Sequence, residues 1–387
     1  MTKPSLQTDA AGLIPGDAAG GILHVDLDAL AANWRSLRDR AGGAEAAAVV
    51  KADAYGTGIE QAVPALLRAG CRTFFVAHVG EAIRTRAAAA EATIYVLNGF
   101  LAGTGPTYAR FDLRPVLGSP EEIAEWAAFC RAENVKHKAA VHVDTGMNRL
   151  GLTVEEGLAL GSHNLLRDFE PALLMSHFVS AEESDNPLNR RQIEAFRAVR
   201  QALPGIPASL ANSSGIFLGE RPHYDLVRPG YALYGGNPTP DRDNPMRPVV
   251  RLEGRIVQLR WVEPDQTVGY NARWTALERR RIATISVGYA DGYPRAASAR
   301  GNNSETVLAG RALVGGIACP FAGNVSMDLI AVDVTEVAAQ VKRGDTVTLI
   351  GDDLTVDEVG RRAGTIGYEI LTSLGRRYAR AYRGGEG

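Results

Sequence analysis

The sequence predicts an α/β protein in which an N-terminal (β/α)8 TIM-type barrel precedes a C-terminal, mostly-β domain. Between residues 21 and 247, short apolar runs alternate with helical segments, an order typical of parallel strands covered by helices. Eight such units in about two hundred residues favour a closed barrel over an open sheet. Over residues 248–387 the apolar runs lie closer together and helical periodicity is lost, which indicates a separate β domain.

Length and composition exclude several classes of protein. The chain has 387 residues, of which 45% are hydrophobic and 22% charged, so it can bury a core larger than that of one small module. Lys and Arg total 42 against 44 for Asp and Glu, which leaves no broad basic field for nucleic acid or anionic lipid. No apolar run is long enough to predict a membrane span or a secretion signal. Cys71, Cys130 and Cys319 lie far apart without a CxxC pair, so we expect no zinc site or disulfide framework and a reducing, cytoplasmic location.

The first predicted elements are a leader and a helix. Residues 1–20 are rich in small residues and proline without periodicity, and we expect them to be disordered. Over residues 26–40 four large apolar residues recur at helical spacing, and Asp26 is placed to cap the helix.

Eight predicted strands then form the barrel. Each is a short apolar run, and the runs end at Lys51, His78, Asn98, Leu117, Asp144, Phe178, Ser213 and Gly230. Two of the intervening helices carry S/T-x-x-E capping boxes, at residues 119–122 and 153–156.

The β domain is predicted from short runs separated by turns rich in Gly and Asp. The predicted strands lie within residues 251–262, 266–271, 280–290, 306–318, 327–334 and 345–351. One helical stretch, from about Thr355 to Arg362, interrupts them.

Barrel enzymes carry their active sites at the carboxyl ends of the strands. The polar residues at or just beyond the predicted strand ends are Lys51, His78, Asn98, Asp144, Arg149, His177, Ser213 and Arg228. A lysine that closes the apolar run AAAVV is unusual among them. The barrel would desolvate its ammonium group and lower its pKa towards the range that Schiff-base chemistry needs.

The segments around these residues resemble the alanine racemase family. VVKADAYGTG (49–58) is similar to the segment of that family in which a lysine binds pyridoxal phosphate. Seven further segments follow in the family's order: VDTGMNRLG (143–151), MSHF (175–178), ANSSG (211–215), VRPGYALYG (227–235), GYADGY (288–293), NVSMD (324–328) and TIGYE (365–369). The resemblance covers nearly all of the chain after residue 21.

The resemblance implies a homodimeric, fold-type III enzyme that interconverts L- and D-alanine with pyridoxal 5'-phosphate and supplies D-alanine for peptidoglycan. Lys51 would hold the cofactor as a Schiff base and act as one catalytic base. Tyr55, Ser213, Tyr368 and the backbone near Gly230 would bind its phosphate.

The family's pattern places Arg228 against the pyridine nitrogen of the cofactor. An arginine can only donate to that nitrogen, which leaves the ring a weaker electron sink and favours racemisation over transamination.

The second base implied by the resemblance is Tyr289, contributed by the partner subunit. A phenol serves as a base at neutral pH only with nearby donors or positive charge. The resemblance implies that His177 is the direct partner of Tyr289 and that Arg228 in turn contacts His177. Arg149 would contact the cofactor and the substrate carboxylate, and Met327 would offer its backbone amide to that carboxylate.

One residue departs from the family's pattern. Many relatives have a carbamylated lysine where this chain has His142, and that carbamate pairs with the equivalent of Arg149. Histidine brings no negative charge, so a bound anion such as chloride, or Asp144 on the same strand face, would have to hold Arg149 instead.

Three other functions remain to be weighed. A non-catalytic pyridoxal-phosphate-binding protein would resemble a lone barrel, whereas this chain continues well past residue 247. A decarboxylase of the same fold type typically needs an acidic partner at the pyridine nitrogen, where this chain has Arg228. A metal hydrolase would use His137, His142, Asp144 and His177.

Among racemases, serine is the alternative substrate, because a small apolar pocket discriminates only weakly against one hydroxyl.

Overall fold

The computed structural model describes residues 18–162, 164–299 and 309–385 and divides into two compact units. The barrel unit consists mainly of residues 30–54 and 58–247. The β unit contains residues 55–57 and 248–384 together with the chain before Leu30. The expected leader lies outside the described residues as far as residue 17.

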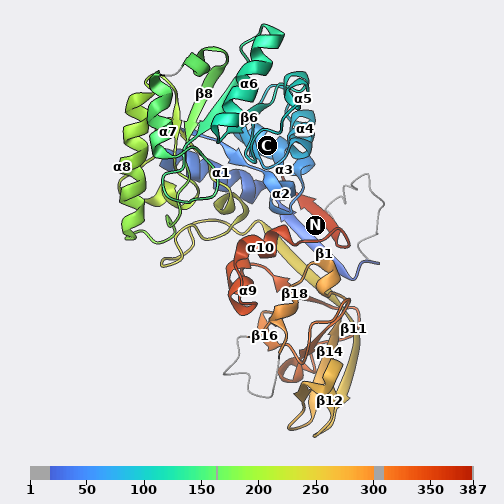
Figure 1. The fold of residues 1–387 in the computed structure, drawn as a ribbon. Helices are drawn as coiled ribbons and strands as arrows, with labels where there is room; N and C mark the ends of the chain where they lie inside the picture. Colours follow the sequence, from blue (N-terminus) through green and yellow to red (C-terminus); the bar gives the residue numbers. More distant parts are fainter. Residues whose placement is uncertain (1–17, 163, 300–308, 386–387) are drawn as a thin grey trace. The chain divides into compact units, whose positions relative to one another are not determined.

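The barrel unit contains all eight strands that the sequence predicts. Figure 1 shows this unit in colours from blue to yellow-green, with β6 and β8 labelled. They are β3 (Ala48–Val49), β4 (Thr73–Val76), β5 (Thr93–Val96), β6 (Arg114–Leu117), β7 (Lys138–His142), β8 (Glu170–Met175), β9 (Ala208–Ser209) and β10 (Leu226–Val227). Strands β3 to β9 pair in parallel in chain order. Strand β10 pairs with β2 (Glu45–Ala46), which directly precedes β3. Two backbone hydrogen bonds, from Asp225 N to Ala208 O (3.0 Å) and from Arg228 N to Ala211 O (2.9 Å), join β10 to β9 and complete the barrel.

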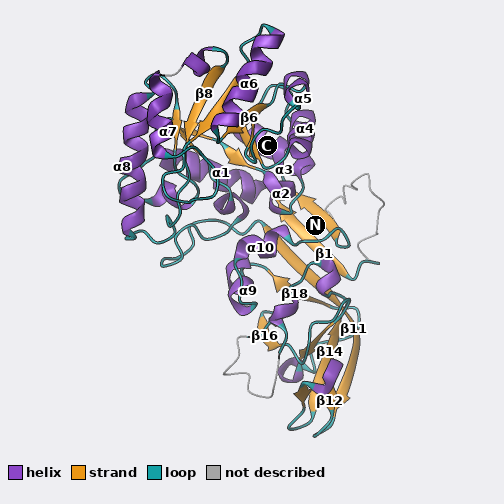
Figure 2. Ribbon diagram, in the orientation of Figure 1, coloured by secondary structure: helices purple, strands orange, loops and turns teal. Residues whose placement is uncertain are grey.

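Helices alternate with these strands along the chain (Figure 2). They are α1 (Leu27–Ala41), α3 (Ile59–Ala69), α4 (Val79–Ala88), α5 (Gly105–Arg110), α6 (Pro120–Glu133), α7 (Val154–Ala159) and α8 (Pro187–Ala202). Asp26 accepts the N–H of Ala29 and so caps α1, as predicted. Over the described ranges, no helix is long and apolar enough to cross a membrane.

The two predicted capping boxes differ in one respect. Thr153 and Glu156 form a reciprocal box at the start of α7. Ser119 caps α6 by accepting the N–H of Glu122 at 3.2 Å, but the Glu122 carboxylate turns away from the Ser119 backbone. It accepts the backbone N–H groups of Gly118 and Phe100 instead, because two loop amides there need an acceptor.

The β unit is built on one eight-stranded sheet. Its strands are β1 (Gly21–Asp26), β11 (Val250–Val262), β14 (Arg280–Ile285), β15 (Arg311–Val314), β16 (Ile317–Pro320), β17 (Ile330–Asp333), β18 (Thr346–Ile350) and β19 (Ala379–Arg383). A small hairpin, β12 (Thr267–Val268) with β13 (Trp274–Thr275), and two helices, α9 (Val356–Arg362) and α10 (Gly367–Thr372), complete the unit.

Four of these elements were not predicted from the sequence: β1, β13, β19 and α10. Strand β1 pairs antiparallel with β11 and parallel with β19, so both of its partners lie more than two hundred residues away along the chain. No local hairpin signal marks such a strand. The predicted helix near residue 355 is confirmed as α9, which Thr355 caps.

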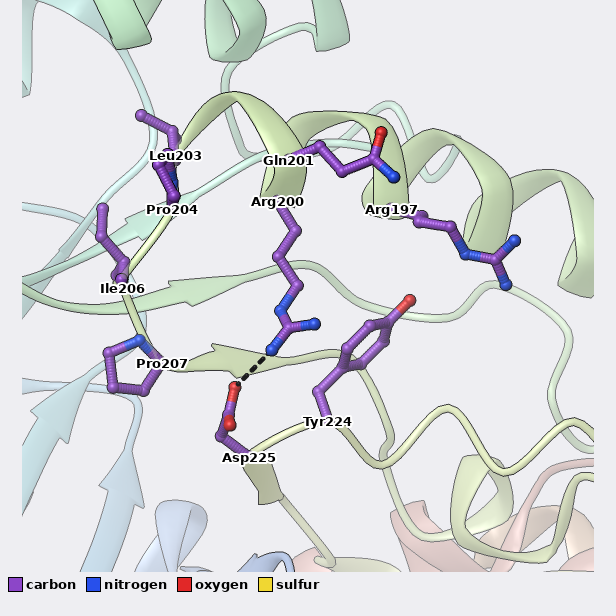
Figure 3. A pocket seen from close by; sticks show the side chains of 10 residues that line it. Arg197, Arg200, Gln201, Leu203, Pro204, Ile206, Pro207, Tyr224 and Asp225 are labelled. Carbon is purple, nitrogen blue, oxygen red and sulfur yellow. Dashed lines mark hydrogen bonds and ion pairs between the residues drawn. The ribbon is translucent and has the colours of Figure 1, made fainter.

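A surface pocket of about 630 Å³ lies at the amino ends of β9 and β10 (Figure 3). The C-terminal turn of α8 forms one side, and Arg200 reaches Asp225 across it at 3.4 Å. This pocket therefore opens at the barrel end opposite to the predicted site residues, which follow the carboxyl ends of the strands.

Candidate active site

Four of the predicted strand-end residues, together with His142, lie at the carboxyl end of the barrel. Lys51 follows β3, His142 ends β7, His177 follows β8 and Arg228 follows β10, while Arg149 lies in the loop after β7. The charges of Arg228, Lys51 and Arg149 all act on the His177 ring. The strand-end rule therefore identified residues that the fold brings together.

Arg228 is buried, with 3% of its surface exposed, and its guanidinium group has only neutral partners among the described residues. It donates to the Ser209 hydroxyl, to Ser176 O at 2.5 Å and to Leu210 O at 3.5 Å. Burial lowers the pKa of Arg228 to about 9, which leaves the side chain charged at neutral pH. A buried charge without a carboxylate is costly unless a polar group compensates it.

His177 stands next to this guanidinium, with 3.5 Å between its Nδ1 and Nη2 of Arg228. Burial, and next the charge of Arg228, hold the pKa of His177 well below its usual range. The ring is therefore neutral and carries one N–H. If Nδ1 accepts from Arg228, that proton is on Nε2, where it can be donated to another group.

Lys51 has the properties expected of a reactive lysine. Burial lowers its pKa, the charge of Arg149 lowers it further, and Glu81 opposes both. Over the described ranges, no acceptor lies within hydrogen-bond distance of its amine. A lowered pKa increases the share of the free amine, which is the nucleophilic form.

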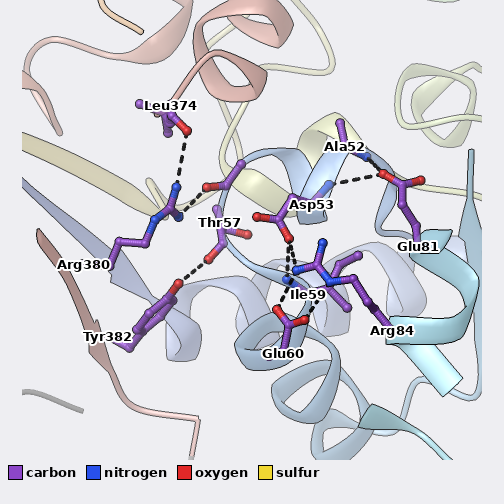
Figure 4. Close-up of polar contacts among 11 residues, drawn as sticks. Ala52, Asp53, Thr57, Ile59, Glu60, Glu81, Arg84, Leu374, Arg380 and Tyr382 are labelled. Atoms are coloured by element: carbon purple, nitrogen blue, oxygen red, sulfur yellow. Dashed lines mark hydrogen bonds and ion pairs between the residues drawn. The ribbon is translucent and has the colours of Figure 1, made fainter. Parts of the chain in front are cut away.

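The turn after Lys51 is left-handed. Ala52, Asp53, Ala54 and Tyr55 all have φ between 52° and 56°, although none of them is glycine. This conformation costs roughly 1–2 kcal/mol per residue, because the Cβ crowds the following carbonyl. The Glu81 carboxylate accepts the N–H groups of Ala52 and Asp53 (Figure 4).

Side chains of two neighbouring helices also hold this turn. Arg84 of α4 donates to Asp53 Oδ1 at 2.6 Å and to both carboxylate oxygens of Glu60 at 2.7 Å. Asp53 Oδ1 also accepts the N–H of Ile59, the first residue of α3, at 3.2 Å. The sequence analysis missed Glu81, Arg84 and Asp53, because none of them ends a strand.

Ser213 and Gly230 form a cluster of donors. The Ser213 hydroxyl, 4% exposed, accepts the N–H groups of Gly230 (3.0 Å) and Ala232 (3.2 Å). Two nearby amides beside a hydroxyl suit an anion with several acceptor oxygens, such as a phosphate.

The loop that carries Arg149 is held by Asp144. The Asp144 carboxylate accepts the backbone N–H groups of Gly146 and Met147, both at 2.7 Å, and that of Arg149 at 3.2 Å. Burial raises the pKa of Asp144, but these hydrogen bonds outweigh it and keep the pKa below its usual range. Burial, aided by Arg228, lowers the pKa of His142 to about 4, so this ring is neutral at pH 7.

Tyr289 and Met327 lie side by side in the β unit. Tyr289 N donates to Ser326 O and Ala290 N to Met327 O, each at 3.0 Å. A Cβ on Gly288 would meet Met327 O, so only glycine allows the two loops to approach so closely. Tyr289 is 40% and Met327 53% exposed, so both side chains face outward.

The β unit also places Tyr55 near Tyr368, with ring centroids 6.3 Å apart. Burial raises the pKa of Tyr55, so its phenol stays protonated and can donate. Strand β19 supports the following residues: Arg380 donates to Gly56 O at 2.6 Å and Tyr382 to Thr57 O at 2.8 Å (Figure 4).

Other polar strand-end residues lie outside this group. His78 and Asn98 contact each other at 3.5 Å. His137 precedes β7 and stacks on Phe129, so it lies at the opposite end of that strand from His142. Within the described residues, no three His, Cys, Asp or Glu side chains are grouped to hold a metal ion.

Comparison with known proteins identifies the family. Residues 25–238 match the family model of the alanine racemase N-terminal domain, and residues 249–382 match that of the C-terminal domain. The chain belongs to the alanine racemase family. Enzymes of this family racemise alanine. The barrel followed by a mostly-β domain, which the sequence predicted, is the fold that this chain shares with a solved alanine racemase.

Individual relatives agree. The chain is 61% identical to the alanine racemase of Methylobacterium nodulans over 94% of its own length and 96% of that protein. It is 60% identical to that of a second Methylobacterium strain over 94% and 98% of the two chains. The crystal structure of Bartonella henselae alanine racemase with covalently bound pyridoxal phosphate superposes with a TM-score of 0.89 at 38% identity, covering 94% of this chain and all of that one.

Proposed function

We propose that this chain racemises alanine by a two-base mechanism, in which Lys51 and the partner subunit's Tyr289 act on opposite faces of the substrate. The observation that carries the proposal is Arg228: a buried, charged guanidinium with only neutral partners among the described residues, next to a neutral histidine.

The residues present fit pyridoxal 5'-phosphate. Lys51 offers an amine with a lowered pKa, which can form a Schiff base with the aldehyde. The Ser213 hydroxyl accepts the amides of Gly230 and Ala232 and can donate its own proton to the phosphate. We assign the backbone near Gly230, Tyr55 and Tyr368 to the same phosphate group. When bound, the cofactor supplies an electron sink for the carbanion at the substrate α carbon.

Arg228 decides which reaction follows. Since its guanidinium remains charged, it can donate to the pyridine nitrogen but cannot accept a proton from it. With the cofactor bound, this donor would make the ring a weaker electron sink and leave more charge at the substrate α carbon. Reprotonation at that carbon, which is racemisation, is favoured over transamination.

The two bases receive different support. Burial and then the charge of Arg149 lower the pKa of Lys51, which favours its free amine. In this proposal the partner subunit's Tyr289 would receive a hydrogen bond from Nε2–H of His177. The Nδ1 of His177 lies 3.5 Å from Nη2 of Arg228, which can donate to it. The exposed position of Tyr289 in the β unit is consistent with its entering the active site of a second subunit. We therefore propose a homodimer with two equivalent sites.

Arg149 and the Met327 amide bind the substrate carboxylate in this proposal. Asp144 holds the backbone of the Arg149 loop, so it takes over part of the role that the resemblance gives to a carbamate. The neutral His142 ring supplies no charge.

Asp144→Ala is therefore expected to raise the KM for alanine about tenfold with a smaller change in kcat, since the loop loses acceptors for three amides. Steady-state kinetics in both directions measures this split. Asp168→Ala is the control, because Asp168 pairs with Arg131 at 2.5 Å on the barrel surface and touches no site residue. A wild-type KM in Asp144→Ala would contradict the assignment.

Arg228→Glu is expected to lower racemisation by about 10²–10³-fold and to raise the ratio of pyruvate formed to alanine racemised. Glutamate replaces a donor by an acceptor at the pyridine nitrogen, which makes the ring a stronger electron sink. Chiral chromatography and a pyruvate assay measure the two products. Arg228→Lys retains a donor and should not raise the ratio, and an unchanged ratio in both variants would exclude the electronic argument.

A panel of both enantiomers of alanine, serine, lysine and arginine tests the substrate. We expect the highest kcat/KM with alanine, and serine is the alternative. D-alanine formed here would supply peptidoglycan synthesis in the cytoplasm. The three described cysteines, Cys71, Cys130 and Cys319, are buried and free, which is consistent with a reducing compartment.

A further inference from the structure

One carboxylate joins two neighbouring loops at the carboxyl end of the barrel. Glu81 Oε1 accepts the N–H groups of Ala52 (2.6 Å) and Asp53 (3.4 Å), in the turn after β3. Its Oε2 accepts those of Ala77 (2.9 Å) and His78 (3.3 Å), at the end of β4. Glu81 therefore fixes the left-handed turn to the adjacent strand.

The turn needs such a restraint. Four consecutive residues with a Cβ, 52–55, adopt a conformation that L-residues disfavour, so the isolated segment would relax to another one. Lys51 directly precedes it, and any relaxation would move the Lys51 backbone as well.

We propose that Glu81 is a positioning residue for Lys51: its carboxylate holds the left-handed turn in place and thereby keeps the Lys51 amine beside Arg149 and His177. The inference rests on the proposed function, in which Lys51 holds the cofactor and acts as a base. Glu81 acts through the backbone and through its charge. It touches neither substrate nor cofactor.

The charge of Glu81 provides a separate signature. Burial and then the charge of Arg149 lower the pKa of Lys51, and the carboxylate of Glu81 raises it. His177 also interacts with Lys51, but burial and the charge of Arg228 hold its pKa well below the usual range, so its ring is neutral. Removing the carboxylate should lower the pKa of Lys51 further, so the free amine appears at lower pH.

The barrel contains a matched control. Glu122 holds the same position in α6, and its two carboxylate oxygens accept Phe100 N–H (2.8 Å) and Gly118 N–H (2.6 Å). It joins the loop after β5 to the end of β6 in the same way, but neither loop carries a residue assigned to the site.

The test compares Glu81→Gln with Glu122→Gln in the full chain. After removal of the cofactor, acetylation of Lys51 by acetic anhydride is followed against pH by mass spectrometry, and binding of pyridoxal phosphate is titrated. In Glu81→Gln we expect the pH midpoint of Lys51 acetylation to be lower than in the wild type. We also expect about tenfold weaker cofactor binding, which corresponds to about 1.4 kcal/mol. Glu122→Gln should lose comparable thermal stability and leave both readouts at wild-type values.

A third variant tests the strain itself. Adding Ala52→Gly to Glu81→Gln removes an exposed Cβ and lets residue 52 adopt a positive φ without penalty. Cofactor binding should recover in part, while the acetylation midpoint stays low because the charge is still missing. This double variant also serves if Glu81→Gln alone folds poorly.

Two results would overturn the proposal: wild-type midpoint and cofactor binding in Glu81→Gln, or equal changes in Glu81→Gln and Glu122→Gln. Failure of the proposed function would look different. Borohydride reduction would then attach the cofactor to a residue other than Lys51. The pH midpoint of Lys51 acetylation would still depend on Glu81.

Discussion

Lys51→Ala is expected to lower kcat by at least about 10⁴-fold, because the variant loses both the amine that holds the cofactor and one of two catalytic bases. Borohydride reduction of the wild-type protein should fix pyridoxal phosphate on Lys51, and peptide mass spectrometry locates the modified residue. In Lys51→Ala the reduced adduct should be missing.

Lys138 provides the control for this variant. It also lies on a barrel strand, but at the amino end of β7, where it is exposed and pairs with Glu170 at 3.5 Å. Lys138→Ala should keep wild-type activity and the adduct on Lys51. An adduct on a different lysine, or full activity in Lys51→Ala, would refute the assignment.

Much of the fold was predictable because it is locally encoded. Each β/α unit of the barrel places a short apolar run beside its own helix, so all eight strands could be identified from short windows of sequence. Strands β1 and β19 could not, since they pair across most of the chain length and neither is joined to its partner by a turn.

The candidate site divides in the same way. Lys51, His177, Ser213 and Arg228 follow from the rule that barrel sites lie at strand ends. Tyr289 and Met327 came only from the family resemblance, because no periodicity links the β unit to the barrel. Neither the strand-end rule nor the family resemblance identified Glu81. Its role depends on a left-handed turn made of Ala, Asp and Tyr, and these residue types do not predict a positive φ.

The second large expected effect on activity concerns the proposed active site that two subunits share. Lys51 and Tyr289 belong to different compact units, and Tyr289 is 40% exposed in its own unit. In the proposed homodimer each chain contributes Lys51 to one site and Tyr289 to the other. Lys51→Ala and Tyr289→Ala should each be nearly inactive, because each variant removes one base from both sites.

Mixing the two inactive variants should restore activity. In a mixed dimer one site collects both defects and the other collects none. Random exchange makes about half of the dimers mixed, each with one intact site of two, so activity should recover to roughly a quarter of wild type. The measurement is alanine racemisation after exchange, with differently tagged subunits to count mixed dimers.

The result distinguishes the two possible arrangements because the defects segregate differently. If Lys51 and Tyr289 of the same chain formed a site, every site in the mixture would keep one defect, and exchange would restore nothing. Activity that rises in proportion to the fraction of mixed dimers therefore requires a site built from two chains. A mixture that stays inactive, although the tags show exchange, would place Tyr289 in the site of its own chain.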